Sequence, residues 1–74
     1  MMRMPNLTHV ESSAIEAVGY DPVRRSLYLR FVNGGRYVYY GVPQEVHKDF
    51  MAAPSKGQFF AHHIRPVFTR YSEW

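Results

Sequence analysis

The chain has 74 residues, of which 46% are hydrophobic and 16% aromatic, and it contains no cysteine. This length allows one small domain, the hydrophobic content argues against intrinsic disorder, and the lack of cysteine excludes a disulfide framework. Nine basic and six acidic residues give a formal net charge of +3, a modest excess for a protein that binds nucleic acid.

The first predicted strand covers residues 14–20 and follows a lead-in, residues 1–11, that shows no clear period. Its apolar and β-branched residues end at Asp21-Pro22, which is typical of a strand that runs into a turn. Gly19 within the strand indicates either a bulge or the close approach of another backbone segment.

The second and third predicted strands form a hairpin. Apolar residues alternate with polar ones over residues 27–31, which is the period of a half-buried strand. Asn33-Gly34-Gly35 follows and favours a tight turn, because these residues tolerate a positive φ. The third strand covers residues 36–40, so the sequence predicts an antiparallel three-stranded meander.

The register of this hairpin determines which face the tyrosines occupy. A two-residue turn pairs Arg30 with Tyr37 and puts Tyr37 and Tyr39 on the same face as Arg30. A three-residue loop with Gly34 in the left-handed conformation pairs Arg30 with Arg36 instead and puts both tyrosines in the core. A core this small needs its aromatic residues inside, which favours the three-residue loop.

Two short helices are predicted after the meander. Pro43 suits the first turn of a helix, and Pro54 ends that helix. Ser55 is a good N-cap for a second helix that runs from Lys56 to about His63. The fold class is therefore α+β, with a three-stranded antiparallel β-meander followed by two short helices packed on one of its faces.

We expect a single domain over residues 12–68, between the loose lead-in and a C-terminal tail, residues 69–74. The tail is either an extra edge strand or packed coil. The N-terminus is too short and too weakly apolar for a signal peptide, and no run of about 18 apolar residues could cross a bilayer. A cytoplasmic location without membrane contact is expected.

Positive charge is concentrated in one segment, because no acidic residue lies between Asp21 and Glu45. The predicted nucleic-acid-binding residues are Arg24, Arg25, Tyr28, Arg30, Arg36 and Lys56. The cations would contact phosphates, and Tyr28 would stack or pack. Neutralising about three or four phosphates gives a shallow log–log salt slope of about −2 to −3, so the interaction would be weak.

Other chemistry has less support in the sequence. Ser55, Lys56 and Gly57 form either a weak anion-binding corner at a helix N-terminus or a plain cap whose glycine allows close packing. His62 and His63 are adjacent and would point about 100° apart on a helix, so they cannot chelate one metal together. We expect no metal site, no cofactor and no enzymatic activity, since no nucleophile stands beside an oriented base.

Several short patterns occur together in one order along the chain. They are Ser12-Ser13-x-Ile15, Gly19-Tyr20-Asp21, Leu27-x-Leu29-x-Phe31-x-Asn33-Gly34, Tyr37-x-Tyr39, Gly41-Val42-Pro43, Ser55-x-Gly57, Phe59 or Phe60, and Ile64-Arg65. This order, with its central Tyr-x-Tyr followed by Val-Pro, resembles the KTSC domain family. That family is found at the C-terminus of some lysyl-tRNA synthetases and as stand-alone small bacterial proteins.

The resemblance implies a set of motif and core residues: Ile15, Leu27, Leu29, Phe31, Tyr37, Tyr39, Val42, Pro43, Phe50, Phe60 and Ile64. It implies no assigned reaction, and it favours RNA only through the attachment to a synthetase. Our leading hypothesis is a small module that binds tRNA or another structured RNA through its basic sheet face. The alternative is a protein-interaction module or homodimer that uses a sheet edge and the aromatic tail with Phe68, Tyr71 and Trp74.

Overall fold

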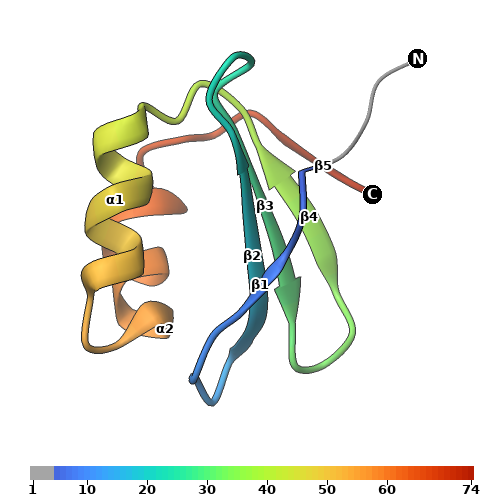
Figure 1. Ribbon diagram of the computed structural model, residues 1–74, viewed down its shortest axis with the longest axis vertical. Helices are drawn as coiled ribbons and strands as arrows, with labels where there is room; N and C mark the ends of the chain where they lie inside the picture. The colour runs from blue at the N-terminus through green and yellow to red at the C-terminus, as the bar shows by residue number, and fades with distance from the viewer. Residues whose placement is uncertain (1–4) are drawn as a thin grey trace.

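The computed structural model describes residues 5–74. Its elements are β1 (Thr8–His9), β2 (Ile15–Asp21), β3 (Ser26–Phe31), β4 (Arg36–Tyr39), α1 (Gln44–Ala52), α2 (Lys56–Phe59), the π-helical turn η1 (Phe60–Ile64) and β5 (Tyr71–Glu73). The strands form one sheet in the order β1-β2-β3-β4-β5. Figure 1 shows the helices on one side of this sheet, so the predicted α+β class is confirmed.

The sheet has five strands, and not the three that the sequence predicted. β1 pairs antiparallel with β2 through Thr8 and Val18, and β5 pairs antiparallel with β4 through Ser72 and Val38. Strands of two and three residues are too short to show an alternating pattern. They form because β2 and β4 each offer a free edge, and the tail is therefore an edge strand.

The β3–β4 hairpin has the three-residue loop. Gly34 has a φ of 96°, and its N–H donates to the carbonyl of Phe31 at 2.9 Å. Leu29 consequently pairs with Tyr37, and Arg30 pairs with Arg36. The two tyrosines of the Tyr-x-Tyr motif therefore face the helices, as the need for aromatic burial predicted.

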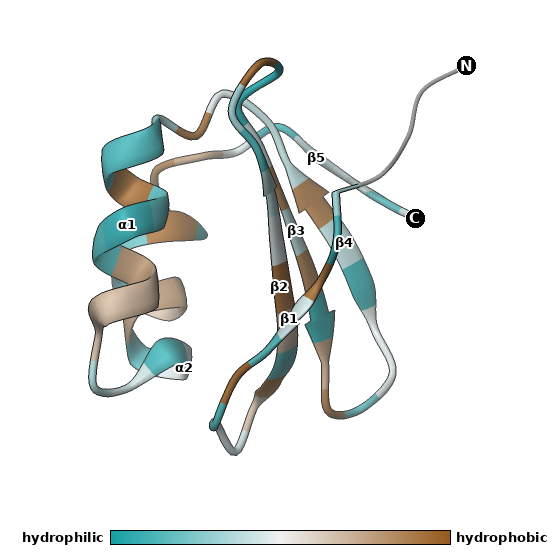
Figure 2. Ribbon diagram, in the orientation of Figure 1, coloured by the Kyte–Doolittle hydropathy of each residue, from teal (hydrophilic) through white to brown (hydrophobic). Residues whose placement is uncertain are grey.

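The core lies between the sheet and the helices. The largest fully buried side chains are Phe50, Ile15, Leu27, Leu29, Ile64, Val18 and Val42. Figure 2 shows hydrophobic residues alternating with hydrophilic ones along the strands. Each fully buried side chain of this size contributes about 1.5–3 kcal/mol, and the helices supply Phe50 and Ile64. Of the predicted motif and core residues, Phe31, Tyr37 and Pro43 are half-buried, and the first two pack against the margin of this core.

Gly19 marks a close approach of the backbone, while the bulge of β2 lies between Ile15 and Ala17. A Cβ atom at Gly19 would lie 2.8 Å from Cδ2 of Leu7 and 3.1 Å from the carbonyl oxygen of Asn6. The segment before β1 therefore crosses directly over β2 at this residue, where only glycine fits without movement.

The helices differ from the sequence prediction at two points. Pro43 occupies the N-cap position before α1 and lies outside its first turn. Ser55 caps α2 as predicted, since its Oγ accepts from the N–H of Gln58 at 3.3 Å. The second helix changes to π-helical geometry after four residues, and the N–H of Arg65 donates to the carbonyl of Phe60 at 2.9 Å. No helix within residues 5–74 is long and apolar enough to span a bilayer.

Candidate functional site

The outer face of the sheet, opposite the helices, gathers Tyr28, Arg30, Arg36 and Trp74, which we term the outer-face cluster. Strand alternation places the first three together, because Arg30 pairs with Arg36 and Tyr28 is the next outward residue on β3. Two guanidinium groups and two aromatic rings can bind phosphates and stack on bases.

Trp74 joins the cluster through β5. Its ring lies edge-on to Tyr28 with 5.9 Å between centroids, and the guanidinium of Arg36 lies 5.3 Å from its ring centroid. Its Nε1 donates to the carbonyl oxygen of Tyr37 at 2.9 Å, which fixes the ring against β4. No local sequence pattern places Trp74 on this face, because the pairing of β5 with β4 brings it there.

Glu16 lies beside the cluster and forms an ion pair with one of its arginines. Its Oε2 is 2.8 Å from Nε of Arg30, and both side chains are about 40% exposed. The bulge between Ile15 and Ala17 contains Glu16 and inserts it next to Arg30. The charge of Arg30 is therefore partly neutralised, while Arg36 packs on Trp74.

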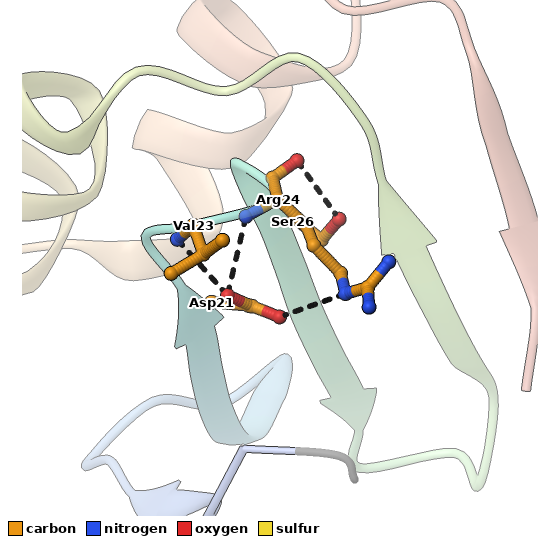
Figure 3. A network of polar contacts seen from close by, with 4 residues as sticks. All are labelled: Asp21, Val23, Arg24 and Ser26. Atoms are coloured by element: carbon orange, nitrogen blue, oxygen red, sulfur yellow. Dashed lines mark hydrogen bonds and ion pairs between the residues drawn. The ribbon is translucent and has the colours of Figure 1, made fainter. Parts of the chain in front are cut away.

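Arg24 lies in the turn between β2 and β3, shown in Figure 3, where its side chain contacts Asp21. Its Nε is 3.7 Å from Oδ2 of Asp21, and Oδ1 of Asp21 accepts from the N–H groups of Val23 and Arg24 at 3.0 and 3.2 Å. Ser26 Oγ donates to the carbonyl of Arg24 at 3.4 Å. Arg24 is thus part of a turn stabilised by its own polar contacts.

Arg25 and Lys56 belong to the helical side of the molecule. Arg25 has a φ of 54°, its carbonyl accepts from Val42, and its side chain lines a surface hollow with His47 and Lys48. Lys56 Nζ donates to the carbonyl of Ala53 at 2.7 Å. Among the predicted nucleic-acid-binding residues, the pairing of β3 with β4 brings together Tyr28, Arg30 and Arg36.

The corner formed by Ser55, Lys56 and Gly57 has local structural roles. Ser55 caps α2, and Lys56 bonds to the end of α1. A Cβ atom at Gly57 would lie 3.5 Å from Cβ of Ala14, which is ordinary van der Waals contact. Anion binding at this corner stays a prediction.

A groove opens on the helix-facing side of the sheet, where β4 and β5 meet η1. It has a volume of about 620 Å³, and its lining includes Phe31, Tyr37, Tyr39, Phe60, Tyr71 and Arg65. Burial raises the pKa of Tyr39, the neighbouring Tyr71 raises it further, and the charge of Arg65 opposes this shift. Phe31, Tyr37, Tyr39 and Phe60 were predicted as motif or core positions. The sequence feature that pointed to these residues was the Tyr-x-Tyr pattern together with Ile64-Arg65.

The histidines do not gather as metal ligands. No group of three or more His, Asp or Glu side chains placed to hold a metal ion occurs among the described residues. The ring of His47 stacks on Tyr20, with 4.5 Å between centroids and 10° between planes. This stacking gives the His47 ring a packing role, and burial lowers its pKa.

Known proteins resemble this chain over most of its length. Residues 11–68 match the model of the KTSC domain. A protein from Tsukamurella paurometabola is 54% identical over 59 residues, which are 80% of this chain and 88% of that relative. The crystal structure of a KTSC domain protein from Yersinia pestis has a TM-score of 0.89 and 40% identity, covering 93% of this chain and 96% of that chain.

A lysine–tRNA ligase from Nostoc sp. also matches, at 41% identity over 58 residues. The match covers 78% of this chain but 10% of the ligase, so this chain resembles one small segment of a much larger protein. The resemblance read from the sequence motifs is confirmed by the matched residues, the relatives and the shared fold. The chain belongs to the KTSC domain family.

Proposed function

We propose that this chain is a non-catalytic RNA-binding module that contacts phosphates through the outer-face cluster. The observation that carries the proposal is the pairing of Arg30 directly opposite Arg36. Like charges in directly opposed positions destabilise a sheet, and a bound phosphate would relieve this repulsion. Tyr28 and Trp74 lie next to the arginines and offer ring surfaces for bases.

The relatives favour a structured RNA such as tRNA as the ligand. The segment matched in the Nostoc lysine–tRNA ligase is a small part of that protein, which is the arrangement of an accessory module. A weak RNA contact gains effective affinity when it is tethered to a second binding site. We infer that this chain makes a weak, salt-dependent contact with RNA in the cytoplasm.

Charge reversal on the two sides of the sheet tests the proposal. Arg36→Glu removes a cation of the cluster, and Lys48→Glu makes the same change of net charge on exposed α1. We expect Arg36→Glu to weaken tRNA binding about tenfold or more, and Lys48→Glu by about twofold at most. Equal losses in the two variants would show that only net charge matters and would contradict the proposed site.

The second candidate function is protein interaction or homodimerisation. It is favoured by β5, an edge strand whose three residues are all exposed. Sedimentation velocity at increasing protein concentration tests the homodimer directly. A monomer at all concentrations would exclude a dimer formed through this edge.

A further inference from the structure

Five aromatic side chains around the groove form a closed series of ring contacts. Tyr71 stacks on Tyr39 with 5.2 Å between centroids, and Tyr39 contacts Phe60 at 5.5 Å. Phe60 contacts Phe31 at 5.3 Å, Phe31 contacts Tyr37 at 5.9 Å, and Tyr37 contacts Tyr71 at 6.1 Å. Each ring therefore touches two others, and we term these five residues the aromatic circuit.

Arg65 supplies the positive charge of this groove. The π-helical turn η1 bonds the N–H of Arg65 to the carbonyl of Phe60, so Arg65 directly follows the turn that carries a ring of the circuit. Burial raises the pKa of the Tyr39 hydroxyl, and the positive charge of Arg65 opposes this shift. Turns of this kind occur frequently at functional sites.

The chemistry of the lining limits what the groove can hold. The lining residues are aromatic, neutral polar or, at Arg65, cationic, and no carboxylate is among them. A cationic ligand would be repelled by Arg65. A purely apolar ligand would desolvate the guanidinium and the tyrosine hydroxyls without hydrogen bonds in return. The groove therefore suits a ligand with a flat ring and a negative charge.

The size of the groove fits one nucleotide. Its volume of about 620 Å³ lies within the range of about 300–1,000 Å³ that is typical of small-molecule sites. Unpaired RNA bases are recognised by stacking on aromatic and arginine side chains and by hydrogen bonds to their edges. Tyr71 is 57% exposed and presents such a ring, and the side chain of Asn33 at the groove is a hydrogen-bonding group.

We propose that the aromatic groove binds a single unpaired nucleotide of an RNA strand, with its base against the aromatic circuit at Tyr71 and its phosphate at Arg65. The inference rests on the proposed function for the class of ligand, but its site lies on the opposite face of the sheet from the outer-face cluster. Because Tyr71 and Trp74 lie on opposite faces of the edge that β5 forms, an RNA strand that crosses this edge reaches both sites.

An NMR titration of the labelled protein with 5′-AMP, adenosine and single-stranded oligoadenylate tests the groove. We expect AMP and the oligonucleotide to shift the signals of Gly35, Tyr37 and Arg65. Arg65→Gln should weaken AMP binding about tenfold and leave adenosine binding nearly unchanged, since only AMP carries the phosphate. Tyr71→Ala should weaken both ligands, and Lys48→Gln, which removes one positive charge on exposed α1, is the control that leaves both unchanged.

The outcomes separate this inference from the proposed function. If about 10 mM AMP shifts no signal of the groove residues, the affinity is weaker than a nucleotide subsite needs, and this result would overturn the inference. So would AMP binding that Arg65→Gln leaves unaltered, or AMP binding without any groove shift from the oligonucleotide. If Arg36→Glu leaves tRNA binding intact while AMP still depends on Arg65, the outer-face proposal fails and the groove stands.

Discussion

The carboxylate of Glu16 contacts the guanidinium of Arg30 at 2.8 Å, although the two residues lie on different strands and 14 positions apart. The β2 bulge places Glu16 on the outer face, where it competes with any phosphate for the same cation. The ion pair is half-exposed, so it contributes little to the free energy of folding. Its main consequence is a weaker positive potential at the outer-face cluster.

Replacement of Glu16 by glutamine should therefore strengthen RNA binding. We expect Glu16→Gln to raise tRNA affinity severalfold and to steepen the log–log salt slope by about one, because Arg30 then neutralises one more phosphate. Asp49→Asn on exposed α1 makes the same change of net charge and is the control. Equal gains in the two variants, measured across a salt series, would mean that the Glu16–Arg30 contact has no specific effect.

Fluorescence should distinguish the two proposed sites. Trp74 is the single tryptophan of the chain and lies in the outer-face cluster. Binding of tRNA at this cluster should change the tryptophan emission, because base stacking or a nearby phosphate alters the surroundings of the indole. AMP, which we place in the groove, should leave the emission unchanged. An AMP-dependent change that persists in Arg65→Gln would place the nucleotide near Trp74 and contradict the groove assignment.

Gly34 should be the residue of the hairpin that tolerates substitution least. Its φ of 96° lies in the left-handed region, where an L side chain costs about 1–2 kcal/mol. We expect Gly34→Ala to reduce the free energy of unfolding by about 1 kcal/mol in urea titrations. Gly34→Asn should cost less, since asparagine adopts this region more readily. Equal losses for alanine and asparagine would point to a cause other than backbone conformation.

His47 should make stability depend on pH. Burial lowers its pKa below the ordinary value of 6.5, so the unfolded chain binds a proton more readily than the folded one. The neutral, buried His47 therefore contributes its full stabilisation of the fold above pH 6.5, and this contribution is lost as the pH falls through the lowered pKa of the folded state.

Urea unfolding of the wild type and of His47→Phe between about pH 7 and pH 5 measures this contribution. The phenylalanine keeps a ring against Tyr20 but cannot titrate. The free energy of unfolding of the variant should therefore fall less than that of the wild type as the pH is lowered. Parallel pH profiles for the two proteins would show that His47 does not contribute.

Local rules made the central elements predictable from the sequence. The alternation at Leu27, Leu29 and Phe31 marks a strand with one buried face, and Gly34 supplies the positive φ of the hairpin loop. Ser55 caps a helix through its own Oγ. Each of these features depends on residues within a few positions of one another, so the chain alone carries the information.

The tertiary structure decided which distant residues meet. Tyr71 reaches Tyr39, Trp74 reaches Tyr28, and Glu16 reaches Arg30 only through strand pairings that no local pattern shows. The arginines that the sequence grouped in one acid-free segment occupy two places, since Arg24 and Arg25 lie in the turn between β2 and β3 while Arg30 and Arg36 pair on the outer face. The sequence by itself determined the meander, the Ser55 helix cap and the family motifs. Only the pairing of β5 with β4 and the packing of η1 completed the outer-face cluster and formed the aromatic groove, because long-range contacts depend on pairing register and side-chain direction.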